Sequence, residues 1–176
     1  MLLISCAAPI TTIRDPRIQD AAGDTQLLEV PFYRQKSLTG CGASAMAGVL
    51  TYWGQAVAPR FILNRFPPTA PTQGYTLGEL KQIARHYQLQ AFAFQADLNA
   101  LETHLAAGRP LIVPLQIDSE LPLMPAYDHY VIVVGLDRMR GRVYMVDPQV
   151  GVIILTLTDF NRKWRAKSRA LLLAAP

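Results

Sequence analysis

Segments with helical patterns come first in this chain, and segments with strand patterns come last. The apolar run 41–53 ends at Gly54, and the segments 76–87 and 98–107 carry apolar residues at helical spacing. Four β-rich runs follow, at residues 111–117, 129–136, 143–147 and 152–157. Because consecutive strands joined by short turns pair antiparallel, this order predicts an α+β fold whose helices lie on one side of an antiparallel sheet.

Shorter elements complete the predicted fold. They are an extended segment at 26–31, a helical turn at 61–65, a strand at 90–94, a helix from residue 158 and a strand at 170–173. Thr76 and Glu79 form a capping box, which fixes the start of the helix that follows. No glycine-rich phosphate loop follows a strand in the sequence, which argues against a nucleotide site.

The composition suits one folded domain. The chain has 176 residues, of which 51% are apolar, and its net charge is +4. Much of the basic excess lies in residues 162–169, RKWRAKSR. A solvated helix face explains this segment best, and a patch for an anionic surface or nucleic acid is the alternative. Because no aromatic-interleaved basic motif accompanies it, we expect no nucleic-acid partner.

The cysteines restrict the chemistry. Cys6 and Cys41 are the only two in the sequence, so they cannot form a disulfide framework, although a single bond between them is conceivable. The sequence contains no CxxC pair and no Cys/His cluster. We therefore expect no metal site and no cofactor.

The N-terminus carries a motif of a different kind. Residues 3–6, LISC, resemble a bacterial lipobox, although the sequence lacks the positive region and most of the apolar region of a signal peptide. We expect residues 1–24 to be a signal remnant and polar tether, anchored by lipid at Cys6, and residues 25–176 to be the folded domain. This interpretation places the protein in the cell envelope, on the periplasmic side of a membrane. If the motif match is chance, the location is cytoplasmic.

Cys41 lies between two glycines where the helix 41–53 should begin. A cysteine attacks as its thiolate, which a helix N-terminus and a neighbouring imidazolium both favour. Gly40 and Gly42 let the backbone turn tightly and leave room for a substrate chain. Gln35 can offer an amide N–H to an oxyanion, and the Cys41 backbone N–H can offer another. Because free cysteines are often buried hydrophobes, this segment alone leaves a packed thiol and a nucleophile equally open.

The sequence has three histidines, and one of them suits a catalytic base. His86 and His104 lie in helical segments and are interpreted as structural. His129 begins the apolar strand HYVIVVGLD after a long loop, and such loops often present functional groups. It is therefore the candidate base for Cys41.

Asp147 is the candidate orienter of His129. It ends the strand of VYMVDPQVG, and if this strand forms a hairpin with HYVIVVGLD, the two residues meet at one edge. A structural Asp-Pro turn is the alternative role. Asp128 adjoins His129 and should point to the other side, while Asp137 lies at the far, turn end of the hairpin.

Together the segments QKSLTGCG, HYVIVVGLD and VYMVDPQVG resemble the double-glycine leader peptidases, which are bacteriocin-processing, papain-like cysteine peptidases. The resemblance covers residues 29–157. It implies a papain-like fold and a peptide or protein substrate. It assigns the oxyanion hole to Gln35, the nucleophile to Cys41, the general base and acid to His129, and its orientation to Asp147.

The chain departs from the family's best-known members, which are N-terminal domains of peptide-exporting ABC transporters. It carries no membrane or nucleotide-binding domain and has Gly40 where they often have Asp, so we expect a free-standing or lipid-anchored relative. The segments 59–75 and 118–128 are expected to line the substrate pockets. A non-catalytic peptide-binding module and an acyltransferase remain alternatives, because hydrolysis and transfer use the same residues.

Overall fold

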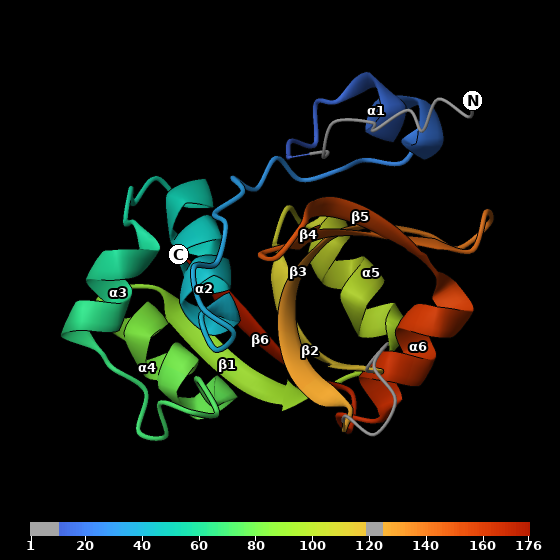
Figure 1. Ribbon diagram of the computed structural model, residues 1–176. Helices are drawn as coiled ribbons and strands as arrows, with labels where there is room; N and C mark the ends of the chain where they lie inside the picture. The colour runs from blue at the N-terminus through green and yellow to red at the C-terminus, as the bar shows by residue number, and fades with distance from the viewer. Residues whose placement is uncertain (1–10, 119–124) are drawn as a thin grey trace, which may run out of the picture.

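The computed structural model describes residues 11–118 and 125–176 (Figure 1). The predicted anchor Cys6 lies outside the described residues, as do residues 119–124 of the loop that precedes His129. None of the helices in the two described ranges is long and apolar enough to cross a membrane.

Apart from α1, which lies in the expected tether, the helices and strands occur in the predicted order. The helices are α1 (Pro16–Ala22), α2 (Cys41–Tyr52), α3 (Pro59–Arg65), α4 (Leu77–His86), α5 (Leu98–Ala106) and α6 (Leu157–Arg165). The strands are β1 (Gln90–Gln95), β2 (Leu111–Ile117), β3 (Tyr127–Asp137), β4 (Arg142–Asp147), β5 (Gly151–Thr156) and β6 (Ala170–Ala175). The capping box of Thr76 and Glu79 begins α4, as predicted. These elements confirm the α+β class.

The strands form one sheet of six in the order β1-β6-β2-β3-β4-β5, and every neighbouring pair is antiparallel. The three pairings from β2 to β5 join strands that are consecutive in the sequence, as the tight turns predict. β6 is different because it inserts between β1 and β2.

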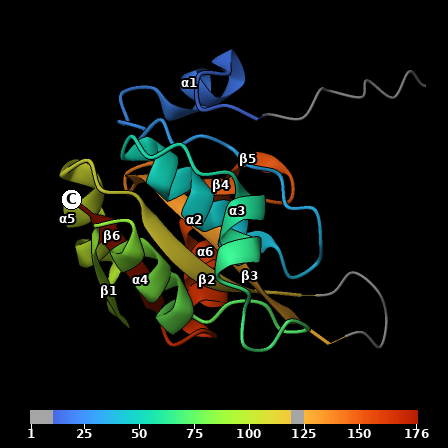
Figure 2. The same ribbon diagram turned by 90° about the vertical axis from the view of Figure 1, so that its left-hand side faces the viewer.

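The helices cover both faces of the sheet. Helices α2, α3 and α4 lie on one side, and α5 and α6 lie on the other (Figures 1 and 2). The expectation that all helices gather on one side was therefore wrong. The burial of consecutive residues in β2 and β3 reflects this arrangement, since strands covered on both faces need apolar side chains on both.

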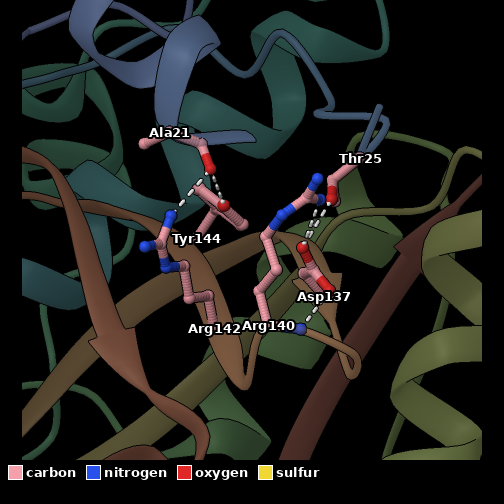
Figure 3. Close-up of polar contacts among 6 residues, drawn as sticks. All are labelled: Ala21, Thr25, Asp137, Arg140, Arg142 and Tyr144. Atoms are coloured by element: carbon pink, nitrogen blue, oxygen red, sulfur yellow. Dashed lines mark hydrogen bonds and ion pairs between the residues drawn. The ribbon is translucent and has the colours of Figure 1, made fainter. Parts of the chain in front are cut away.

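The described part of the predicted tether is a packed segment. Helix α1 begins at Pro16, with Asp15 as its N-cap, and Ile13 and Ile18 are buried. The Ala21 carbonyl accepts hydrogen bonds from Arg142 Nη1 at 2.9 Å and Tyr144 Oη at 2.8 Å, so the segment is fastened to β4 (Figure 3). The nearby Thr25 hydroxyl donates to Asp137 Oδ2 (Figure 3).

Helix α2 approaches β3 closely at Gly48. A β-carbon built at Gly48 would lie 2.9 Å from both Ile132 Cδ1 and the Pro31 carbonyl oxygen, which is closer than real β-carbons come. Glycine at this position therefore lets the helix that begins with Cys41 pack closely against the strand that carries His129.

The basic segment 162–169 lies on α6 and the turn after it. Trp164 is buried, whereas Arg162 and Lys163 pair with Asp118, and Lys167 pairs with Asp128. This arrangement favours the solvated helix face over a nucleic-acid patch.

Candidate active site

Cys41 is the first residue of α2, with Gly40 as the N-cap, as the sequence predicts. It is 7% exposed and lines a cleft of about 630 Å³. Its thiol is thus largely enclosed but borders a space that a substrate can enter.

His129, on β3, lies near both candidate partners. Its Nε2 lies 2.7 Å from Asp147 Oδ1, and it lines the same cleft as Cys41, whose side chain contributes to the raised pKa of His129. Because Asp147 occupies Nε2, Nδ1 is the ring nitrogen left for Cys41. The structure therefore brings together the nucleophile, base and orienter predicted from the sequence.

The β3–β4 hairpin positions His129 and Asp147. Ile132 pairs with Val146, so the register continues to Asp147 beside Val131, and His129 lies diagonally across on the same face. Asp147 Oδ1 also accepts the Gln149 backbone N–H at 2.7 Å, which fixes the carboxylate within its turn. The pairing is thus offset by two residues rather than directly side by side.

The electrostatics of the site favour a protonated imidazole. Burial lowers the pKa of His129, which is 3% exposed. The hydrogen bonds and negative charges of Asp147 and Cys41 outweigh burial and raise the pKa of His129 to about 9. A protonated His129 places a positive charge in the cleft that Cys41 lines.

Gln35 lies against Gly40, the residue before Cys41. A β-carbon built at Gly40 would be 3.5 Å from Gln35 Cβ. The Gln35 backbone N–H donates to the Pro148 carbonyl at 2.8 Å, so Gln35 is tied to the turn that holds Asp147. Its side-chain Nε2 donates one hydrogen to the Ser37 carbonyl at 3.0 Å, which leaves the second N–H for another acceptor.

The competing residues lie elsewhere. His86 is exposed on α4, and His104 packs near the end of α5 against Phe94. Asp128 pairs with Lys167, and Asp137 accepts hydrogen bonds from Thr25 and Arg140. None of these four residues joins the Cys41–His129–Asp147 group.

The cleft is only partly lined by the segments expected to form it. Five residues between 69 and 75, and Asp128, do line it, which confirms part of the prediction. The sequence analysis missed seven other lining residues, namely Thr76, Leu77, Glu79, Pro114, Tyr130, Lys167 and Ala170. Lys167 and Ala170 reach the cleft because β6 pairs with β2. No local sequence pattern predicts that pairing.

Gly42 serves a different purpose from the one expected. A β-carbon built there would lie 3.1 Å from Tyr75 Cβ and Cδ2 and 3.4 Å from Tyr130 Cδ2. The space beside Gly42 therefore holds two tyrosine side chains rather than a substrate chain.

Glu79 fixes the wall of the cleft formed by residues 69–76. Its carboxylate accepts the backbone N–H groups of Thr76 and Thr69, each at 2.7 Å. These hydrogen bonds, that from Thr76 foremost, lower the pKa of Glu79 to about 2. The hydrogen bond from Thr76 can be predicted from the capping box in the sequence. The hydrogen bond from Thr69 cannot, because it forms only when the loop folds.

The described residues contain no cluster of three His, Cys, Asp or Glu side chains able to hold a metal ion. The chemistry of this site is therefore argued from its own side chains.

The fold is that of known cysteine peptidases. A double glycine motif protease from an AMS/PCAT transporter, solved in complex with a leader peptide, matches with a TM-score of 0.68 and 20% identity over 86% of this chain and 94% of that chain. A putative C39-like peptidase from Bacillus anthracis matches with a TM-score of 0.74 and 18% identity over 87% of this chain and 98% of that chain. The peptidase domain of Streptococcus ComA, a bifunctional ABC transporter, matches with a TM-score of 0.66 and 17% identity over 82% of this chain and 96% of that chain. The fold is thus a papain-like cysteine peptidase fold.

The sequence comparison gives the family itself. The profile of the Peptidase C39 family matches residues 29–176, which is most of the chain. No curated protein sequence matches. The chain belongs to the Peptidase C39 family and is a cysteine-type peptidase.

Proposed function

We propose that this chain hydrolyses peptide bonds with Cys41 as nucleophile, His129 as general acid and base, and Asp147 as the orienter of His129. The observation that carries the proposal is the His129 ring, which bonds Asp147 through Nε2 and lines the same cleft as Cys41. A solved structural neighbour is described as a double glycine motif protease bound to a leader peptide, which supports a peptide substrate.

The first half of the reaction forms a thioester. The Cys41 thiolate attacks the carbonyl carbon, and the charge that develops on oxygen is stabilised by the Cys41 backbone N–H and the second Nε2 hydrogen of Gln35. As the C–N bond breaks, the imidazolium of His129 gives its proton to the leaving amine. The nucleophile and the acid both line the cleft, so both can reach the same substrate bond.

The second half consumes water. Neutral His129 takes a proton from water, which attacks the thioester carbonyl, and the C–S bond breaks to release the acid. Asp147 holds the ring orientation and stabilises the imidazolium in both halves. The bond from Asp147 to His129, together with Cys41 in the same cleft, favours catalysis over a module that only binds peptides.

The proposal is tested in a Cys6→Ala background, where Cys41 is the only remaining cysteine. We expect iodoacetamide to label Cys41 at neutral pH faster than it labels N-acetylcysteine, because the adjacent imidazolium favours thiolate. A mixture of quenched fluorescent peptides, including some with a central Gly-Gly pair, should yield cleavage products identified by mass spectrometry. Labelling no faster than the free thiol, together with intact peptides, contradicts the proposal.

Gln35→Ala is expected to reduce kcat by about 10²- to 10³-fold, the usual effect of removing one oxyanion donor. Iodoacetamide labelling of Cys41 should remain largely unchanged, because alkylation forms no oxyanion. Gln149→Ala is the matched control, since only the backbone of Gln149 contacts Asp147 and Arg34. A parallel loss of labelling and turnover in Gln35→Ala would assign Gln35 to the thiol environment instead.

A further inference from the structure

A second pocket borders the start of α2. Its volume is about 200 Å³, and it lies between residues 33–36 and α3, which runs beside α2 (Figure 2). Gly40 lines this pocket and directly precedes Cys41, which lines the cleft. Because neighbouring α-carbons are about 3.8 Å apart, the pocket lies within one or two substrate residues of the nucleophile.

The rim of this pocket is strongly basic. Arg34, Lys36 and Arg60 line it, and the lining includes no Asp or Glu. Across residues 11–118 and 125–176, none of these three cations forms an ion pair with a carboxylate. Arg34 donates to the Gln149 carbonyl at 2.8 Å, and Arg60 lies 4.9 Å from the centre of the Phe61 ring. The three positive charges thus remain uncompensated within the described chain.

The floor of the pocket is formed in part by Ser44, which is 2% exposed. Its hydroxyl can donate a hydrogen bond to a group bound in the pocket. Three cations with no carboxylate among the lining residues favour an anionic partner that comes from outside the chain.

We propose that this basic pocket, formed by Arg34, Lys36, Arg60 and the floor residue Ser44, binds a carboxylate of the peptide substrate. This inference rests on the proposed peptidase function and adds a charge preference to it. The carboxylate belongs either to an acidic side chain within about three residues of the cleaved bond or to the C-terminus of the peptide. Both sources offer the same two oxygens to guanidinium and ammonium donors.

The first test is kinetic. A cleaved quenched peptide is remade with Glu or Gln at each of three positions on either side of the cleaved bond, and with a free or amidated C-terminus. We expect one Glu position, or the free C-terminus, to raise kcat/KM about tenfold, the effect of one charge-assisted hydrogen bond. The Lys36→Gln/Arg60→Gln variant should lose this preference and cleave the acidic and neutral peptides at equal rates.

The matched control is Arg65→Gln/Lys81→Gln. Arg65 lies on α3 over the Phe66 ring, as Arg60 lies over Phe61, but neither Arg65 nor Lys81 lines the basic pocket. This variant should keep the full preference. A preference that survives in the Lys36→Gln/Arg60→Gln variant, or the absence of any acidic preference in wild type, overturns the proposal.

The second test separates the pocket from the chemistry. Fluorescence polarisation with Cys6→Ala/Cys41→Ala protein measures binding of the same labelled peptides without cleavage. Tighter binding of the acidic peptide, lost in the Lys36→Gln/Arg60→Gln background, supports the pocket even if wild-type protein cleaves nothing, an outcome that contradicts only the peptidase proposal. Equal binding of the Glu and Gln peptides, or no binding of any acidic peptide, overturns the carboxylate site.

Discussion

Alanine at Cys41, at His129 or at both is expected to reduce kcat/KM to one common level, at least roughly 10⁴-fold below wild type. The reason is that the two side chains act as a single unit, in which the imidazolium sustains the thiolate and later protonates the leaving amine. Once either group is lost, the other has no catalytic role to lose. The measurement is peptide turnover by the two single variants and the double variant, all in the Cys6→Ala background.

His86→Ala is the control for this prediction. His86 is an exposed histidine on α4, away from the cleft, so its removal should leave turnover within about twofold of wild type, as is usual for surface substitutions. Circular dichroism and urea unfolding check that the Cys41 and His129 variants remain folded. If the double variant loses the sum of the two single effects, Cys41 and His129 act independently and the proposed pair is wrong.

Asp147→Asn is expected to shift the alkaline limb of the pH–rate profile. In wild type, the pKa of His129 is raised to about 9 by hydrogen bonds and charge from Asp147 and Cys41, so activity should persist to about that pH. An amide removes the negative charge beside Nε2, and the pKa of His129 then falls toward the ordinary value of about 6.5. We expect a loss of about tenfold or more at pH 8 and a smaller loss at pH 6, where histidine is mostly protonated in both proteins.

The same group affects stability in a defined direction. The folded-state pKa of His129 lies above the unfolded value of about 6.5, so its contribution is complete below that pH and is lost as pH rises through about 9. Urea unfolding across this window should show a decline in wild type and a flatter profile in Asp147→Asn. Asp137→Asn, at the far end of the hairpin, is the control. Its pH–rate profile should keep an alkaline limb near pH 9. An unshifted limb in Asp147→Asn contradicts its assigned role.

The local parts of the site could be predicted because the sequence encodes them locally. Gly40, Cys41 and the apolar run after them specify a helix that begins at the cysteine. His129 and Asp147 lie near the ends of two consecutive strands joined by a short turn, so their proximity is local. The β-bulge between Val133 and Gly135, which shifts the register by one residue, was not predicted. Gln35 lies within a few residues of Cys41, so its neighbourhood is also local.

The long-range parts could not be predicted in the same way. The apolar segment 170–173 indicates a buried strand but does not name its neighbours, so the insertion of β6 and the positions of Lys167 and Ala170 were missed. The segment near α1 resembled a tether because it has few apolar residues, and the burial of Ile13 and Ile18 arises only in the folded chain. The tyrosines beside Gly42 likewise come from two distant segments.

The position of β6 bears on when the sheet is completed during synthesis. β1 lies with the helices on the side of the molecule that carries Cys41, and β2 begins the run of strands that carries His129 and Asp147 (Figure 1). β6 joins these two halves, yet the ribosome makes it last of the six strands. A nascent chain that already contains Cys41, His129 and Asp147 therefore still lacks the strand that closes the sheet between β1 and β2, so we expect the complete sheet to form only when translation of the domain is nearly finished.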